Sequence, residues 1–236
     1  MDVYDKYIRT VNDFPIKGIK FRDITPLLAN GDSFHQAIMD LNKILPSYEK
    51  WDKIICAESR GFIFGAPLAS INNKGIVIAR KPGKLPLVGL RESYDLEYGK
   101  ATIEIPEGCI QKGERVIILD DLIATGGSAN AMKKLVERCG GIPIMGLFLI
   151  ELRSLEGYKV LNLPCASIVS YGLHQGELLH IENGHAVLGT FVKKIDEDHI
   201  EVVYEDEFKE TISKSQIINI VEKDEKGRLS YIKYRD

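Results

Sequence analysis

The sequence predicts an α/β fold in which a mainly parallel sheet is covered by helices, a hairpin projects from the sheet, and a small antiparallel β module follows. Three observations lead to this prediction. Continuous apolar strands alternate with helical segments, which is typical of a parallel sheet buried on both faces. One segment of strict alternation interrupts this rhythm. After about Gly172 the segments become short, β-branched and separated by acidic turns. We therefore divide the chain into residues 1–172 and an extension, residues 173–236.

The elements of residues 1–172 follow from periodicity and from turn residues. The stretch FHQAIMDLNKIL has amphipathic spacing and stops at Pro46, so it predicts a helix. ESYDLEYGKATIEI alternates with period two around Gly99, which predicts a hairpin. The predicted elements in chain order are a helix over Ser33–Leu45, a strand over Lys53–Cys56, a helix over Gly61–Ile71, a strand over Gly75–Ala79, the hairpin over Glu92–Ile105, a strand over Arg115–Leu119, a helix over Ala129–Cys139 and a strand over Ile142–Ile150.

The extension has a different texture. Its strand-like stretches are AVLGTFVKKI, HIEVVYE, ETISKSQIINIVE and LSYIKYRD. Within the second of them, Ile200, Val202 and Tyr204 share one face while Glu201 points to the other. This pattern predicts a self-contained antiparallel β module, which the chemistry of the protein should not require.

Composition restricts the class of protein. Apolar content of 44%, charged content of 28% and a net charge of −3 describe an ordinary globular chain without the basic surface of a nucleic-acid-binding protein. No apolar segment is long enough to cross a membrane and none resembles a secretory signal, so we expect a cytoplasmic protein. The four cysteines form no Cys-x-x-Cys pair, and the histidines near the extension match no zinc-ligand spacing.

The stretch VIILDDLIATGGS, residues 116–128, carries the chemistry. A buried strand is predicted to end at Asp120 and Asp121, and a glycine-rich turn leads into the next helix. In open α/β sheets, ligands bind beyond the carboxyl ends of the strands. Gly126 and Gly127 allow successive backbone N–H groups to turn toward one ligand, and this cradle suits a phosphate. The paired carboxylates suit a metal or vicinal hydroxyls, so a sugar phosphate fits both features. An N-cap alone would explain one acid and not two.

Other phosphate-binding signatures are absent from the sequence. It contains no Gly-x-x-x-x-Gly-Lys-[Ser/Thr] and no Gly-x-Gly-x-x-Gly after a strand, which disfavours a P-loop NTPase and a dinucleotide site. Residues 116–128 instead resemble the ribose-phosphate motif of type I phosphoribosyltransferases. FPIKGIKFRDITPLL (14–28), AESRGFIFGAPLA (57–69), RKPGKLP (80–86) and SYDLEYGKATIEI (93–105) resemble the adenine-specific members of that family. These motifs occur in the family's order and together span about residues 1–172.

The resemblance implies a reaction and a set of partners. Adenine and phosphoribosyl pyrophosphate would give AMP and pyrophosphate in purine salvage, with residues 1–172 as the catalytic domain. Mg²⁺ would be held mainly by substrate and water, with no direct protein ligand expected. The family also implies a homodimer, whereas the net charge and the lack of a long apolar segment argue against nucleic-acid and membrane partners.

The resemblance further assigns roles to individual residues. Asp120 and Asp121 would face the ribose hydroxyls and the charge that develops on the ring. Glu97, with Tyr98 beside it, would accept the proton from adenine. The 5′-phosphate would be held by Ala124, Thr125, Gly126, Gly127 and Ser128. The pyrophosphate would meet Glu58, Ser59, Arg60, Gly61, Arg80, Lys81 and Lys84, where the family commonly carries Asp in place of Glu58. Adenine would stack between Phe21 and Leu122, its edge read by the main chain at Lys20 and Arg22.

Two alternatives stay open from the sequence. A transferase for another purine base is the nearer one, although a 6-oxopurine enzyme would be expected to place Lys or Asp against the base. The other is a regulator that senses phosphoribosyl pyrophosphate and binds nucleic acid through its extension. From Gln175 onward the extension has nine basic and fourteen acidic residues, which disfavours contact with a phosphate backbone.

Overall fold

The computed structural model describes residues 3–96, 99–174, 176–183, 185–204, 207, 209–223 and 229–236. The chain forms two compact units. The first comprises Met1–Ile150 and Tyr158–Val169, and the second comprises Glu151–Gly157 and Ser170–Asp236. The second unit therefore includes a short segment that comes well before the extension in sequence, which the sequence pattern did not indicate.

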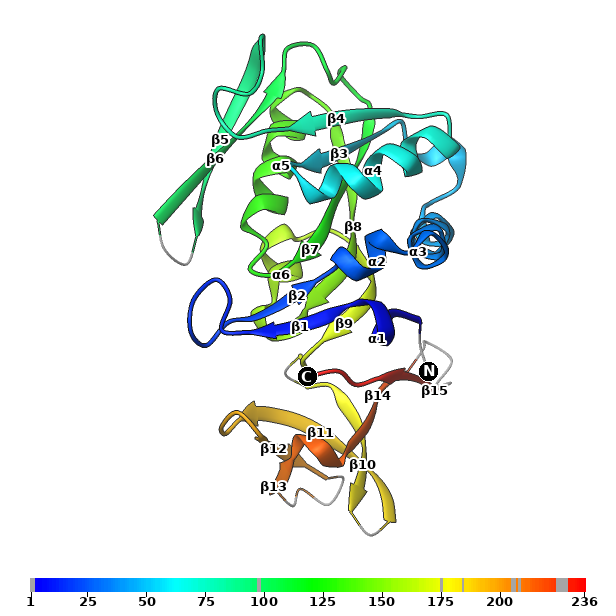
Figure 1. Ribbon diagram of the computed structural model, residues 1–236, viewed down its shortest axis with the longest axis vertical. Helices are drawn as coiled ribbons and strands as arrows, with labels where there is room; N and C mark the ends of the chain where they lie inside the picture. Colours follow the sequence, from blue (N-terminus) through cyan, green and yellow to red (C-terminus); the bar gives the residue numbers. More distant parts are fainter. Residues whose placement is uncertain are drawn as a thin grey trace. The chain divides into compact units, whose positions relative to one another are not determined.

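The first unit is built on a five-stranded sheet in the order β4-β3-β7-β8-β9 among the described residues (Figure 1). Strand β3 pairs in parallel with both β4 and β7, so that Ile55 lies between Val77 and Ile118. This confirms the predicted parallel sheet. The strands are β3 (Lys53–Ala57), β4 (Gly75–Ala79), β7 (Arg115–Ile123), β8 (Ile142–Leu152) and β9 (Cys165–Tyr171).

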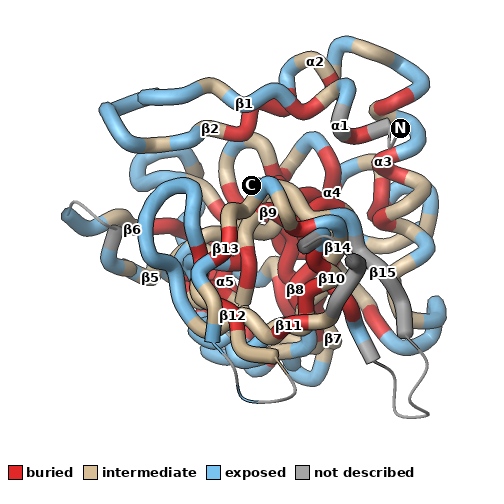
Figure 2. Tube along the Cα trace, turned by 90° about the horizontal axis from the view of Figure 1, so that it is seen from below, coloured by how far each residue is buried: buried red, intermediate tan, exposed pale blue. Residues whose placement is uncertain are grey.

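Helices α4 (Arg60–Ile71) and α5 (Gly127–Arg138) cover opposite faces of this sheet. On one face, Ile55 and Ile118 share a core with Met132 of α5. On the other face, α4 lies so close to β3 that a Cβ on Gly65 would come within 2.1 Å of the Cys56 sulfur. Successive residues in the middle of β3 and β7 are therefore buried alternately under the two helices, which explains why these stretches are apolar on both faces. Figure 2 colours the buried residues of the chain red.

The remaining elements of the first unit flank the sheet. The hairpin is confirmed as β5 (Val88–Leu96) and β6 (Gly99–Pro106), which pair antiparallel. The predicted helix after Asn30 is also confirmed, and it begins earlier than Ser33 because the Asn30 side chain accepts a hydrogen bond from the Ser33 N–H at 2.9 Å. The other elements are α1 (Val3–Tyr7), β1 (Arg9–Asn12), β2 (Lys20–Asp23), α2 (Thr25–Ala29), α3 (Gly31–Ile44), η1 (Tyr48–Lys50) and α6 (Gly157–Leu161), the last beginning in the second unit.

The end of β7 differs from the prediction. The strand does not stop at Asp120 and Asp121 but continues through both to Ile123. Both acids therefore lie within the strand, where the Asp121 N–H donates a hydrogen bond to Oδ1 of Asp120 at 2.9 Å. The following helix, α5, correspondingly begins at Gly127 rather than Ala129.

The second unit is an antiparallel sheet in the order β13-β12-β11-β10-β14-β15 across the residues that are described. This confirms the predicted β module. Strand β14 comes late in the chain but pairs antiparallel with β10, the first strand of this sheet in sequence. The strands are β10 (Leu178–Asn183), β11 (His185–Lys194), β12 (His199–Val203), β13 (Lys209–Ser213), β14 (Ile217–Lys223) and β15 (Leu229–Lys233), with η2 (Arg153–Leu155) and η3 (Lys214–Gln216) beside them.

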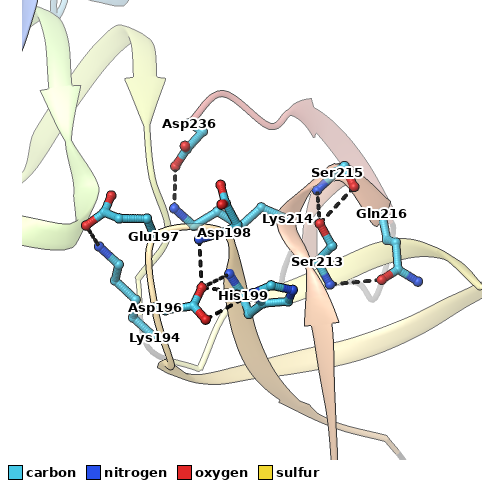
Figure 3. Close-up of polar contacts among 10 residues, drawn as sticks. All are labelled: Lys194, Asp196, Glu197, Asp198, His199, Ser213, Lys214, Ser215, Gln216 and Asp236. Carbon is cyan, nitrogen blue, oxygen red and sulfur yellow. Dashed lines mark hydrogen bonds and ion pairs between the residues drawn. The ribbon is translucent and has the colours of Figure 1, made fainter. Parts of the chain in front are cut away.

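An aliphatic core and polar turns stabilise this unit. The shared face predicted for Ile200 and Val202 is confirmed, and it points into the core, since both residues are buried in one cluster with residues of β10, β13 and β14. The turns are closed by local hydrogen bonds: Asp196 accepts from the backbone N–H of His199 at 2.8 Å, and Ser213 and Gln216 form a capping box (Figure 3). Within the described part of the chain, no helix is long and apolar enough to cross a membrane.

Candidate active site

A cavity of about 420 Å³ opens in the first unit where β3 and β7 end. Its position agrees with the rule that open α/β sheets bind ligands beyond the carboxyl ends of their strands. The cavity is lined by Ala57, Glu58, Ser59, Arg60, Lys81, Pro82, Tyr94, Ala101, Thr102, Ile103, Asp120, Asp121 and Ser128.

The two acids of β7 are the most unusual groups in this cavity. Burial raises the pKa of Asp120 well above its ordinary value, and the neighbouring Asp121 carboxylate raises it further. Burial also raises the pKa of Asp121, against which Arg60 acts in the opposite direction. The Asp120 Oδ1 accepts a hydrogen bond from the Asp121 N–H at 2.9 Å. Asp121 is buried and the adjacent Asp120 is half-buried, and two neighbouring carboxylates with raised pKa values in one cavity are typical of a functional site.

The loop after β3 places a cation beside these acids. Arg60 is the first residue of α4, and its Nε lies 3.0 Å from Oδ2 of Asp121. The next residue, Gly61, allows α4 to approach β7 closely, because a Cβ there would lie 2.9 Å from Oδ1 of Asp120. Ser59 is the N-cap of α4 and also lines the cavity. The start of α4 is thereby fitted directly against the acidic end of β7.

The turn between β7 and α5 has the geometry of an anion site. Gly126 has a φ of 80°, a left-handed conformation that residues with a side chain adopt with strain. The first backbone N–H groups of α5 have no partner within the helix, and the helix dipole adds positive potential there. Ser128 reaches the cavity, Thr125 is exposed, and Ala124 is half-buried. Gly127 lets the hairpin pack against this turn, since a Cβ there would lie 3.0 Å from the ring of Tyr94.

The basic residues after β4 have two different environments, since one lines the cavity and another pairs with Glu58. Lys81 lines the cavity, whereas Arg80 and Lys84 do not. Arg80 donates to both carboxylate oxygens of Glu58, at 3.1 and 3.3 Å, and to the backbone carbonyl of Lys84 at 3.1 Å. These hydrogen bonds, together with one from the Lys81 N–H, hold the pKa of Glu58 below its ordinary value. Glu58 and Arg80 therefore fasten this segment to the loop after β3.

The predicted base-binding residues lie on β2 and late in β7. Phe21 is half-buried, and the Arg60 guanidinium lies 5.4 Å from the centre of its ring. Lys20 is exposed, and Arg22 is buried with a hydrogen bond to the Thr10 hydroxyl. Leu122 is half-buried. None of these predicted residues lines the cavity itself, and Arg60 is the group that links Phe21 to it.

The hairpin contributes to the site, as its predicted residues Glu97 and Tyr98 imply, but the hairpin residues that line the cavity were not predicted. Tyr94, Ala101, Thr102 and Ile103 line the cavity, and burial followed by the charge of Asp120 raises the pKa of Tyr94. The period-two alternation of β5 was the available signal, because it divides the strand's residues between two faces and places Tyr94 on the same face as Glu92. The two predicted residues at the tip, Glu97 and Tyr98, lie outside the described residues.

The donor set of the cavity has a limited capacity for a metal ion. In the described ranges of the chain, no group of three or more His, Cys, Asp or Glu side chains is arranged to hold one. The carboxylates of Asp120 and Asp121 are the acidic groups of the cavity that are not engaged by Arg80. Mg²⁺ commonly binds through one or two carboxylates together with substrate phosphates and water, and this set fits such an ion.

Comparison with known proteins gives a consistent family. The phosphoribosyl transferase domain family matches residues 28–147. The adenine phosphoribosyltransferases of Fervidobacterium nodosum and Brachyspira hyodysenteriae are 47% and 50% identical over 166 residues, which cover 70% of this chain and 97% of each of those proteins. The crystal structure of adenine phosphoribosyltransferase from Thermoanaerobacter pseudethanolicus matches with a TM-score of 0.68 and 46% identity over 71% of this chain and 97% of that one. This chain therefore belongs to the adenine phosphoribosyltransferases of the type I phosphoribosyltransferase family.

Proposed function

We propose that this protein transfers the 5-phosphoribosyl group of phosphoribosyl pyrophosphate to adenine, forming AMP and releasing pyrophosphate in purine salvage. The observation that carries the proposal is that Asp120, Asp121, Arg60 and Ser128 line one cavity. A sugar with a phosphate at one end and a pyrophosphate at the other needs hydroxyl acceptors between two anion sites. Identity of 50% to the Brachyspira hyodysenteriae enzyme supports adenine as the base.

The ribose 5-phosphate end would be held by β7 and the turn after it. The ribose hydroxyls donate hydrogen bonds to Asp120 and Asp121. The N–H groups of residues 124–128, with the hydroxyls of Thr125 and Ser128, surround the 5′-phosphate. As the bond at C1′ breaks, positive charge develops on the ribose ring beside both carboxylates. Fixed charges of this kind stabilise the transition state without reorganising.

The pyrophosphate end would be held by the loop after β3. Ser59 and Arg60 would face the departing group, the backbone N–H of the buried Gly61 would add a donor, and Lys81 adds a cation from the segment after β4. Glu58 serves as the group that positions that segment, because Arg80 and the Lys81 N–H already occupy its oxygens. Asp120 and Asp121 are the residues toward which Mg²⁺ would be held, mostly by substrate oxygens and water. When bound, the ion neutralises charge on the leaving group.

Adenine would stack on Phe21 and be enclosed by Leu122, an arrangement worth about 1–3 kcal/mol by analogy with base–aromatic stacking in nucleic-acid-binding proteins. The main chain at Lys20 and Arg22 reads the edge of the base. Glu97 accepts the proton that adenine loses as its nitrogen attacks C1′, and Tyr98 lies beside it in sequence. The hairpin wall around Tyr94 excludes water, which would otherwise hydrolyse the activated sugar.

The protein is also proposed to act as a homodimer. Helix α4 is apolar on most of its surface, and its outward residues Ile63 and Ile71 remain 37% and 54% exposed. Ile76 on the adjoining strand β4 is also exposed. Exposed aliphatic side chains gathered on neighbouring elements are typical of a surface that a protein partner covers. Light scattering after size-exclusion chromatography should give twice the mass of the 26.5 kDa chain, and a monomer at micromolar concentration would reject the dimer.

The function is tested by product formation from a panel of bases. The full chain is incubated with phosphoribosyl pyrophosphate and Mg²⁺, together with adenine, hypoxanthine or guanine. We expect AMP and pyrophosphate to form in equal amounts with adenine, and nucleotide formation to be at least about 10³-fold slower with the 6-oxopurines, whose edge presents the wrong hydrogen-bonding groups. A preference for hypoxanthine or guanine, or no turnover of any base, would reject the proposal.

A further inference from the structure

Arg60 makes two contacts in the free protein that lie in different parts of the proposed site. Its Nε lies 3.0 Å from Oδ2 of Asp121, at the ribose position. Its guanidinium carbon lies 5.4 Å from the ring centre of Phe21, at the base position. The side chain of Asp121 is only 7% exposed, whereas that of Arg60 is 40% exposed. One partly exposed side chain thus bridges a buried carboxylate and the aromatic ring of Phe21.

This bridge should hinder adenine from binding alone. A base that stacks on Phe21 must displace the guanidinium that lies over the ring. Displacing Arg60 also removes the cation that pairs with Asp121, and a buried carboxylate left without its partner is strongly unfavourable. Adenine carries no charge, so it offers neither Arg60 nor Asp121 an ion pair in exchange.

The sugar substrate compensates for both losses. Its pyrophosphate offers Arg60 a more highly charged anion, to which a guanidinium can donate two parallel hydrogen bonds. Its ribose hydroxyls donate to Asp121 at the moment when Arg60 leaves. The first substrate therefore clears the Phe21 ring that the second one needs.

We infer that Arg60 couples the two substrate sites, covering Phe21 in the free protein and releasing it when a phosphorylated ribose and pyrophosphate bind. This inference rests on the proposed function. It assigns to Arg60 a role in positioning that goes beyond contact with the leaving group. Because coupling is reciprocal, adenine should also strengthen the binding of the sugar ligands by the same factor.

The test measures adenine binding by calorimetry, with and without a saturating mixture of ribose 5-phosphate, pyrophosphate and Mg²⁺. This mixture occupies the site without reacting with adenine, so only binding is measured. In the wild-type protein we expect the mixture to raise adenine affinity by about 5-fold to 150-fold, the usual range of such coupling. Arg60→Ala should bind adenine more tightly than the wild type when no other ligand is present. Its enhancement by the mixture should fall below about 2-fold.

Two further variants keep the result interpretable. Arg115→Ala removes an arginine of similar exposure, 38%, that pairs with Asp52 away from the cavity, and it should retain the wild-type enhancement. If Arg60→Ala does not fold, Arg60→Lys keeps a cation near Asp121 without the planar group over Phe21, and its enhancement should be less than half that of the wild type. An enhancement unchanged in the folded Arg60 variant overturns the inference. A wild-type protein that makes no AMP overturns the proposed function instead.

Discussion

Replacing Gly61 by alanine tests how closely the start of α4 must fit the end of β7. The added Cβ would lie 2.9 Å from Oδ1 of Asp120 and 3.3 Å from the carbonyl oxygen of Leu119. The second contact involves backbone and cannot be relieved by a side-chain rotation. The first turn of α4, which carries Arg60, must therefore move away from β7 by about 0.5 Å to restore ordinary van der Waals separation.

The size of the effect follows from this displacement. Overpacking at a closely fitted position costs about 1–3 kcal/mol of folding stability. Functional groups generally have to be held within about 0.5 Å of their productive geometry, and an error of about 1 Å can reduce the rate about 10²-fold. We therefore expect kcat/KM for phosphoribosyl pyrophosphate to fall about 10-fold, which corresponds to about 1.4 kcal/mol of transition-state stabilisation.

The assay combines thermal unfolding with initial rates at varied phosphoribosyl pyrophosphate. Gly31→Ala is the matched control, because Gly31 begins helix α3 and a Cβ there would meet nothing within 4 Å. The control should change stability by less than about 1 kcal/mol and leave the rate unchanged. Wild-type kcat/KM in Gly61→Ala would refute the claim that α4 and the acidic pair are fitted to each other for catalysis.

The remaining predictions concern the turn, the acids, the hairpin tip and the second unit. Gly126→Val should weaken AMP binding about 10-fold to 100-fold by calorimetry, because valine resists the φ of 80°. Asp120→Asn should lower kcat about 10²-fold to 10³-fold. The folded state raises the pKa of Asp120 above its unfolded value, so the stability of the wild type falls as pH rises from the unfolded pKa toward the folded pKa. The side-chain amide in Asp120→Asn has no such dependence. The melting temperature of the variant should therefore exceed that of the wild type by a margin that grows with pH above about 4. Glu97→Gln should lower kcat about 10²-fold with little change in KM. Glu177→Gln should cost about 3–5 kcal/mol of stability and leave kcat unchanged, because it removes the carboxylate that pairs with the buried Arg153.

Controls and opposing outcomes are specific to each prediction. Gly113→Val introduces the same strain at a φ of 85° outside the cavity, so it should reduce stability but not AMP affinity, and equal losses of affinity in both variants would contradict the phosphate turn. Glu197→Gln alters an ion pair whose carboxylate side chain is 76% exposed and should change stability by less than about 1 kcal/mol. A near-wild-type kcat in Glu97→Gln would remove Glu97 from catalysis. A melting-temperature difference that does not vary with pH would contradict the assigned shift of Asp120.

Most of the fold could be predicted because its core strands are apolar on both faces and its helices are bounded by glycine or proline. The hairpin was predictable from alternation around Gly99. Strands β9 and β10 were not predicted, because sequences that mix polar and apolar residues acquire their conformation from partners elsewhere in the chain, such as β14 for β10. The assignment of Glu151–Gly157 to the second unit likewise depends on tertiary contacts, among them the pairing of Arg153 with Glu177.

The site residues that belong to short sequence motifs could be predicted. The structure brings together around one cavity the predicted residues Glu58, Ser59, Arg60, Lys81, Asp120, Asp121 and Ser128. Sequence alone did not reveal that Arg80 is used to hold Glu58, since this pair is 22 residues apart and forms only when two strand ends adjoin. It also did not reveal the inward position of Tyr94, which depends on how the hairpin packs against α5.

The central claim is that the end of β7 and the turn after it bind a ribose phosphate. A crystal structure of the full chain with AMP and pyrophosphate tests this most directly. We expect the AMP phosphate to accept hydrogen bonds of about 2.7–3.2 Å from backbone N–H groups of residues 124–128, with the ribose hydroxyls donating to Asp120 and Asp121. Phosphate density away from this turn, or a ribose that touches neither carboxylate, would contradict the account.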